Sequence, residues 1–174
     1  MRLFIAFLPD EETRQRLEDI QRSMKEKGIR GRYTEPFNLH MTLLFIGEYG
    51  DPDHVMDVLE EIPFEPCTLT LSHIERMHDM YLCIVKDNDE VSSYVRRLRR
   101  ACAEQEIPFD RKSFLPHITL LRKADVIDEP DLSELIQEQT MPVSAISLMK
   151  SEHGKNGMVY TEIGRIEYIP EHHE

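Results

Sequence analysis

LHMTLLFIGE, residues 39–48, and PHITLLRKAD, residues 116–125, carry the same five-residue pattern in the two halves of the chain. Each stretch reads His, any residue, Thr, Leu, Leu, and its dense β-branched and aliphatic content predicts a buried strand. On a strand, residues two apart point to the same face. His40 therefore lies beside Thr42, and His117 beside Thr119. The alternate residues should face the core; these are Met41, Leu43, Ile118 and Leu120.

The composition is that of a globular protein with an acidic surface. The 174 residues are 40% hydrophobic and 31% charged, with a formal net charge of −12. We therefore expect one bilobal domain over residues 1–174 and no partner among long duplex nucleic acids, which require a broad basic face. A small phosphate-bearing ligand could still bind at local basic spots, which are Arg30 with Arg32, Arg111 with Lys112, and Arg122 with Lys123.

Cysteine usage and hydropathy predict a cytoplasmic protein that has no membrane partner. The three cysteines show no metal-type spacing and are expected to be reduced thiols. The N-terminal apolar run is too short for a signal peptide, and no run reaches the length of a membrane-spanning helix.

Strands and helices alternate irregularly along the chain. Apolar runs predict strands at residues 2–8, 39–46, 67–77, 80–86, 116–122, 143–152 and 159–169, and helical spacing predicts helices at residues 10–28, 51–62 and 88–102. The last two strands form an antiparallel hairpin in this interpretation. The fold class is therefore α+β, with two similar halves facing each other, and not a doubly wound parallel sheet.

Two imidazoles and two hydroxyls facing each other suit the cleavage of a phosphodiester. In-line attack at phosphorus needs a base on one side and an acid on the other, and imidazole serves both roles because its pKa is near ~6.5. Hydroxyls can donate to the non-bridging oxygens, where negative charge develops. No cofactor is needed for this chemistry. The other histidines, which include His172 and His173, lack the motif, and no zinc-type spacing is present, so we expect no metal site.

The motifs and their surroundings resemble the two-histidine (2H) phosphoesterase superfamily, specifically its LigT-like RNA 2′,3′-cyclic phosphodiesterases, also named 2′-5′ RNA ligases. Beyond the two His-x-Thr motifs, the resemblance includes MRLFIAFLPDEE at the start and SLMKSEHGKNGMVYTEIG near the end. It implies a bilobal α+β fold, with two antiparallel sheets around a central cleft, helices on the outer faces, pseudo-two-fold symmetry and one His-x-Thr motif per lobe.

The resemblance also implies residue roles. His40 would be the proton donor and His117 the proton acceptor, while Thr42, Thr119 and Arg122 would bind phosphate. Simple alternation places Arg122 on the opposite face from His117, so a twist, a bulge or the end of the strand would be needed for it to reach the site. The resemblance leaves open whether Ile5 or Phe7 lines the cleft.

The expected activity is hydrolysis of a terminal 2′,3′-cyclic phosphate to a 2′-phosphate, with 2′-5′ ligation as the reverse chemistry. The expected partners are RNA ends, tRNA fragments among them, or small cyclic nucleotides, and we expect a monomer. Two alternatives stay open. One is a module that binds nucleotides or RNA ends with little catalysis, and the other is a 2H phosphodiesterase for 2′-5′ oligonucleotides or ADP-ribose cyclic phosphate.

Overall fold

The computed structural model describes residues 1–170 and has nine strands and three α-helices in that range. The elements in chain order are β1 (Arg2–Phe7), α1 (Glu11–Glu26), β2 (Arg30–Tyr33), the 3₁₀ turn η1 (Pro36–Asn38), β3 (Met41–Glu48), α2 (Pro52–Glu61), β4 (Cys67–Met77), β5 (Met80–Val85), α3 (Asp89–Glu104), β6 (His117–Asp125), β7 (Thr140–Val143), β8 (Ala145–Gly154) and β9 (Gly157–Glu167). The predicted α+β class is confirmed. Residues 171–174, with His172 and His173, lie outside the described range.

All strand pairs within residues 1–170 are antiparallel and belong to one curled sheet of nine strands, which divides into two groups at a seam between β3 and β6. The strand order is β7-β4-β5-β6-β3-β1-β8-β9, and β2 pairs with β6 on the edge away from β5, the edge that β3 also joins. A single residue pair, Met41 with Ile118, joins β3 to β6. The two groups are therefore held at this seam mainly by packing. Each group contains one of the two His-x-Thr motifs next to the seam.

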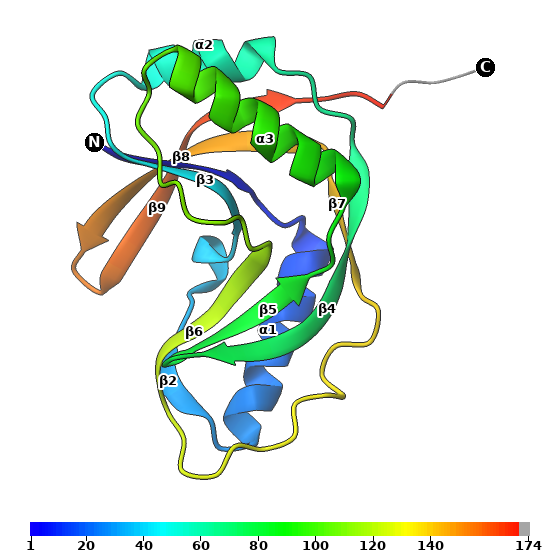
Figure 1. Cartoon of the computed structure of the whole chain (residues 1–174). Helices are drawn as coiled ribbons and strands as arrows, with labels where there is room; N and C mark the ends of the chain where they lie inside the picture. The colour runs from blue at the N-terminus through cyan, green and yellow to red at the C-terminus, as the bar shows by residue number, and fades with distance from the viewer. Residues whose placement is uncertain (171–174) are drawn as a thin grey trace.

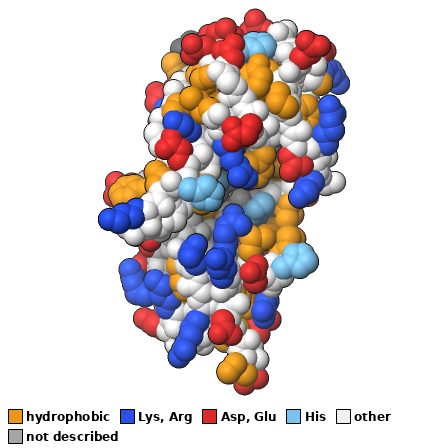
Figure 2. All heavy atoms as spheres, turned by 90° about the vertical axis from the view of Figure 1, so that its left-hand side faces the viewer, with side chains coloured by type: hydrophobic (Ala, Val, Ile, Leu, Met, Phe, Trp, Pro, Cys, Tyr) orange, Lys and Arg blue, Asp and Glu red, His pale blue; other side chains and the backbone are white. Residues whose placement is uncertain are grey.

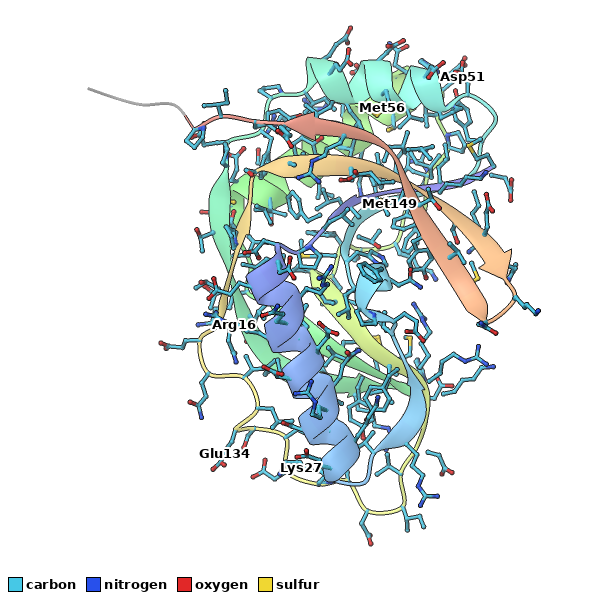
Figure 3. All side chains as sticks on the ribbon, turned by 180° about the vertical axis from the view of Figure 1, so that it is seen from behind. Arg16, Lys27, Asp51, Met56, Glu134 and Met149 are labelled. Atoms are coloured by element: carbon cyan, nitrogen blue, oxygen red, sulfur yellow. The ribbon has the colours of Figure 1, made fainter. Side chains whose placement is uncertain are left out.

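The helices cover the outer surfaces of the two groups (Figure 1). α1 lies against β4, β5 and β6, whereas α2 and α3 pack together over β1, β3, β8 and β9. Each helix that precedes a motif in the sequence thus covers the group that holds the other motif. Figure 3 shows Met56 of α2 above β9, where Gly164 leaves room for its sulfur. One hydrophobic core cluster runs through both groups of strands.

The helix starts are set by side-chain caps that the sequence signals correctly. Asp10, Asp51 and Asn88 each accept a hydrogen bond from the backbone N–H three residues later. Such caps satisfy one of the free N–H groups in the first turn. The predicted core residues of the motifs are confirmed, with exposures of 0% for Met41, Ile118 and Leu120 and 1% for Leu43.

The sequence-based prediction missed two short strands. β2 is mostly exposed and contains a glycine, and β7 contains Pro142. Both lie at edges, where they pair with only one neighbour, so their stability comes from that neighbour and not from their own apolar pattern. The predicted strand over residues 143–152 is divided at Ser144 into the end of β7 and the start of β8.

Candidate active site

His40 lies just before β3 and is held by two hydrogen bonds. Its Nδ1 is 2.7 Å from the carbonyl oxygen of Asn38, and its Nε2 is 2.9 Å from the hydroxyl oxygen of Thr42. Because a carbonyl only accepts, Nδ1 carries the proton and Nε2 accepts from the Thr42 hydroxyl. The Asn38 amide in turn donates to the carbonyl oxygen of Met158 at 2.9 Å, which ties this turn to β9. The imidazole is therefore fixed with Nε2 beside Thr42.

His117 repeats this arrangement at the start of β6. Its Nδ1 is 2.6 Å from the carbonyl oxygen of Leu115, two residues earlier, just as Nδ1 of His40 faces the carbonyl two residues earlier. Both rings therefore carry a proton on Nδ1, which leaves Nε2 as the nitrogen for proton transfer. Thr119 stands two residues further along the same strand. The two motifs thus share the contact between Nδ1 and the carbonyl two residues earlier, whereas the hydrogen bond between Nε2 and the threonine hydroxyl is found in the first motif.

A β-bulge in β6 decides the position of Arg122. Thr119 pairs with Leu82 of β5, but the neighbouring Tyr81 pairs with Leu121, so Leu120 is an extra residue opposite this step. The extra residue shifts the side-chain alternation by one. Leu120 and Leu121 are both buried, and Arg122 emerges on the same face as Thr119. Of the three ways for Arg122 to reach the cleft, the structure uses the bulge.

The side chain of Gln21 stabilises the bulge from α1. Its Nε2 donates to the carbonyl oxygen of Leu120 and to that of Thr34, both at 3.0 Å. The hydroxyl of Thr34 donates to the carbonyl oxygen of Thr119 at 2.8 Å. Gln21 is only 6% exposed, and its buried amide joins the carbonyls of Thr34 and Leu120, the second of which also accepts from the backbone N–H of Thr34 at 2.9 Å.

The first motif contains a corresponding bulge. Thr42 pairs with Ala6 of β1 while Leu44 pairs with Ile5, so Leu43 is the extra residue. Phe45 consequently emerges on the same face as Thr42, at the position that Arg122 has in the second motif. Its side chain is 47% exposed, which is unusual for phenylalanine. The two motifs therefore present the same His–Thr pair to the cleft. They differ at the next residue that faces the cleft, which is the aromatic Phe45 in the first motif and the cationic Arg122 in the second.

All five residues that the sequence predicted for the site line one cleft of about 410 Å³ at the seam between the two groups of strands. The lining residues are Arg2, Leu3, Phe4, His40, Thr42, Phe45, His117, Thr119, Arg122, Ser151, Met158 and Tyr160. A second hollow of about 390 Å³ shares Thr42, Phe45, His117, Thr119 and Arg122 and extends towards Met80 and Phe114. Figure 2 shows Lys and Arg side chains across the middle of this side of the molecule and Asp and Glu crowded at its upper end.

Aromatic rings surround His40 and lower its pKa. The His40 ring lies 4.9 Å from the Phe4 ring and 5.1 Å from the Tyr160 ring, measured between centroids. Burial among these rings, opposed by the Asn38 carbonyl and assisted by the positive charges of His117 and Arg122, lowers the pKa of His40 to about 4. His40 is thus neutral at pH 7 in the empty cleft.

The residues that the sequence missed are the aromatic ones. Ile5 and Phe7 were the candidates for the cleft, but both are 0% exposed in the core, and Phe4 lines the cleft instead. In β1, which lies between β3 and β8, the odd-numbered residues face the core under the helices. Alternation therefore turns the even-numbered Phe4, and not Ile5 or Phe7, towards the cleft. No local sequence motif indicated that Tyr160 of β9 belongs to the site, since only the folding of the β8–β9 hairpin brings its ring to that of His40.

No helix within residues 1–170 is long and apolar enough to cross a bilayer. Over the same described range, no three His, Cys, Asp or Glu side chains come together as the ligands of a metal ion would.

Comparison with known proteins gives a consistent family. The family model described as "2'-5' RNA ligase superfamily" matches residues 9–155. A curated relative from Thermus thermophilus, named RNA 2′,3′-cyclic phosphodiesterase, is 29% identical over 188 residues, which covers 99% of this chain and 92% of the relative. A crystal structure of a Thermus thermophilus protein superimposes with a TM-score of 0.80 at 28% identity, covering 99% of this chain and 100% of the other. Escherichia coli LigT complexed with 3′-AMP superimposes with a TM-score of 0.79 at 22% identity, covering 96% of each chain.

Proposed function

Because the chain belongs to the 2′-5′ RNA ligase superfamily, we propose that it hydrolyses the 2′,3′-cyclic phosphate at the end of an RNA to a 2′-phosphate. The observation that supports this most directly is the pair of His–Thr units facing one cleft, each with Nδ1 bonded to a carbonyl, which leaves Nε2 as the nitrogen for proton transfer. The names of the curated relatives support the same reaction. Binding alone would not need two imidazoles fixed in the same tautomer.

In this proposal the cyclic phosphate lies between the two motifs. The hydroxyls of Thr42 and Thr119 donate to its non-bridging oxygens, and the guanidinium of Arg122 neutralises its charge. When the Thr42 hydroxyl turns to the phosphate, it releases Nε2 of His40 from the hydrogen bond that it makes in the empty cleft. Substrate binding therefore prepares His40 for proton transfer.

The two histidines then share the proton transfers. His117 takes a proton from the attacking water, and His40 gives a proton to O3′ as the P–O3′ bond breaks, which leaves the phosphate on O2′. His40 is neutral in the empty cleft, so this assignment requires it to gain a proton when the phosphate arrives. The anion favours this protonation, since it offsets the positive charge of Arg122, which is one of the causes of the low pKa of His40.

Proton uptake tests the assignment of the two roles. Binding of 2′-AMP at pH 6.5, followed by calorimetry in buffers of different ionisation enthalpy, should show uptake of about one proton, and His40→Asn should abolish it. Binding without proton uptake would reverse the roles and make His40 the base.

We propose that the nucleoside stacks on the exposed ring of Phe45, next to Phe4. The two rings are 5.9 Å apart between centroids, and Phe4 also contacts Tyr160 at 5.2 Å. Every base has an aromatic face, so such a platform binds bases with little sequence preference. The crystallised complex of LigT with 3′-AMP supports a nucleotide as the ligand of this chain too.

The activity is tested with purified protein in EDTA. Adenosine 2′,3′-cyclic phosphate and an oligonucleotide ending in a cyclic phosphate should each yield a 2′-phosphate. His40→Ala and His117→Ala should each reduce kcat by roughly 10²–10⁴-fold. His54→Ala, which changes a histidine of α2 outside the cleft, is the matched control. Full activity in either cleft variant, or turnover only after a metal is added, would contradict the proposal.

The second hollow favours one further candidate reaction at the same site. It continues from His117 and Thr119 towards Met80, Leu82 and Phe114, so a nucleoside could lie on each side of the phosphate. A 2′-5′ phosphodiester, cleaved or formed by the reverse reaction, would use both hollows. Incubating the protein with 2′-5′-linked ApA should then give adenosine and the cyclic nucleotide.

We also propose a cytoplasmic location and a monomeric state. The three cysteines, Cys67, Cys83 and Cys102, form no disulfide, which suits a reducing compartment. Size-exclusion chromatography with light scattering tests the monomer.

A further inference from the structure

Two arginines lie directly opposite each other where β2 meets β6. Arg32 of β2 pairs with Arg122 of β6 in the antiparallel ladder. Directly paired residues point to the same face, with Cα atoms about 4.5–5.5 Å apart. Because Arg122 lines the cleft, Arg32 emerges on the cleft side immediately beside it. Arg32 and Arg122 are both exposed.

This pairing is unfavourable for the protein alone. Like charges directly opposite on neighbouring strands repel each other. Among residues 1–170, neither arginine forms a salt bridge, and the guanidinium of Arg122 donates to the sulfur of Met80 at 3.1 Å. In a chain with a net charge of −12, two cations without a carboxylate partner beside the cleft indicate an anionic ligand.

The fold enforces the close approach through Gly31. A Cβ at this position would lie 2.9 Å from the carbonyl oxygen of Arg122 and 3.0 Å from Cα of Ala124. These are backbone atoms that cannot rotate away, so only glycine lets β2 approach β6 this closely. Tyr33, next to Arg32, also anchors β2, because its hydroxyl donates to the carbonyl oxygen of Ile29 at 2.7 Å. Arg32 is therefore held in place beside Arg122.

We propose that Arg32 binds the 5′-phosphate of the terminal nucleotide of the RNA. This is the phosphate next to the terminal cyclic phosphate, which lies at Arg122. The inference rests on the proposed function, because it takes the cyclic phosphate to lie at Arg122. A guanidinium suits this role because its planar donors match two phosphate oxygens. The consequence is selectivity for RNA ends: a cyclic nucleotide that also carries a 5′-phosphate or an upstream nucleotide is a better substrate than the bare cyclic nucleoside.

Three substrates test this selectivity. They are adenosine 2′,3′-cyclic phosphate, the same compound with a 5′-phosphate, and the dinucleotide ApA ending in a cyclic phosphate. For the wild type, kcat/KM should be at least roughly tenfold higher for the two substrates that have the extra phosphate, as expected for one charge-assisted hydrogen-bonded contact. Raising the salt concentration should reduce this advantage, and a plot of log kcat/KM ratio against log salt concentration should have a slope of about −0.7 for the one contact.

Variants assign the advantage to Arg32. Arg32→Gln should reduce the ratio of kcat/KM values, with and without the 5′-phosphate, to about 1, and Arg32→Lys should retain part of it. Arg16→Gln makes the same charge change on α1, on the side of the molecule away from the β8–β9 hairpin (Figure 3), and should retain the full ratio. A ratio unchanged in Arg32→Gln, or reduced equally in Arg16→Gln, would overturn the inference.

Binding of the products separates failure of this inference from failure of the proposed function. Calorimetry should show that adenosine 2′,5′-bisphosphate binds roughly tenfold more tightly than 2′-AMP, and that Arg32→Gln removes the difference. Equal affinities in the wild type would overturn the Arg32 site whether or not the protein turns over a cyclic phosphate. The expected difference in binding, with no turnover of any of the three substrates, would retain the site and contradict the proposed activity.

Discussion

Lowering the pH from 7 to 5 should destabilise the protein through His40. Its pKa is about 4 in the folded protein, against a value of 6.5 for the unperturbed group, so the unfolded chain takes up a proton in this range that the native state does not. The stabilisation is thus present above the unfolded pKa and is lost as the pH falls towards the folded pKa. For these two values the free energy of unfolding falls by about 2 kcal/mol between pH 7 and pH 5.

Urea denaturation of the wild type and of His40→Asn at both pH values measures this contribution. An asparagine amide can still donate to the carbonyl of Asn38, but it does not titrate. Other groups titrate equally in both proteins, so the difference between the two pH dependences isolates His40. Between pH 7 and pH 5, the free energy of unfolding should therefore fall less for His40→Asn than for the wild type, and the difference between the two decreases should be about 2 kcal/mol. Equal pH dependences would refute the assignment of the low pKa to the buried His40.

Three further changes test the bulge, the β2–β6 contact and the aromatic platform. Gln21→Leu leaves the Thr34 carbonyl without its donor and the Leu120 carbonyl with only the Thr34 N–H, so it should destabilise the protein by about 1–3 kcal/mol in urea denaturation, while raising KM through Arg122. Gly31→Ala should lower Tm and destabilise the protein by about 1–3 kcal/mol, because its Cβ meets backbone atoms of β6. Phe45→Ala should weaken binding of 2′-AMP by about 1–3 kcal/mol, and Phe45→Tyr should retain it. Unchanged stability in the first two, or unchanged affinity in the third, would contradict the corresponding role.

The sequence determined the local structure around each motif. Within residues 1–170, apolar periodicity and capping residues located the three α-helices and seven of the nine strands, because these signals act within one element. The repeated His-x-Thr pattern also identified the two imidazoles and two hydroxyls that line the cleft. These inferences depend only on the two-residue period of a strand, and that period holds from His40 to Thr42 and from His117 to Thr119.

Only the tertiary structure decided what lies beyond Thr42 and Thr119. Alternation placed Arg122 on the wrong face, because the bulge at Leu120 arises from its register with β5 and from Gln21 of α1, which is distant in the sequence. The position of Phe45 likewise depends on a bulge in the pairing of β3 with β1. Arg32 lies beside Arg122 because β2 pairs with β6, and no local sequence signal indicates this pairing. A strand's own sequence fixes its period, but the extra residue that shifts the period is stabilised by other elements, and it becomes visible only when these are in place.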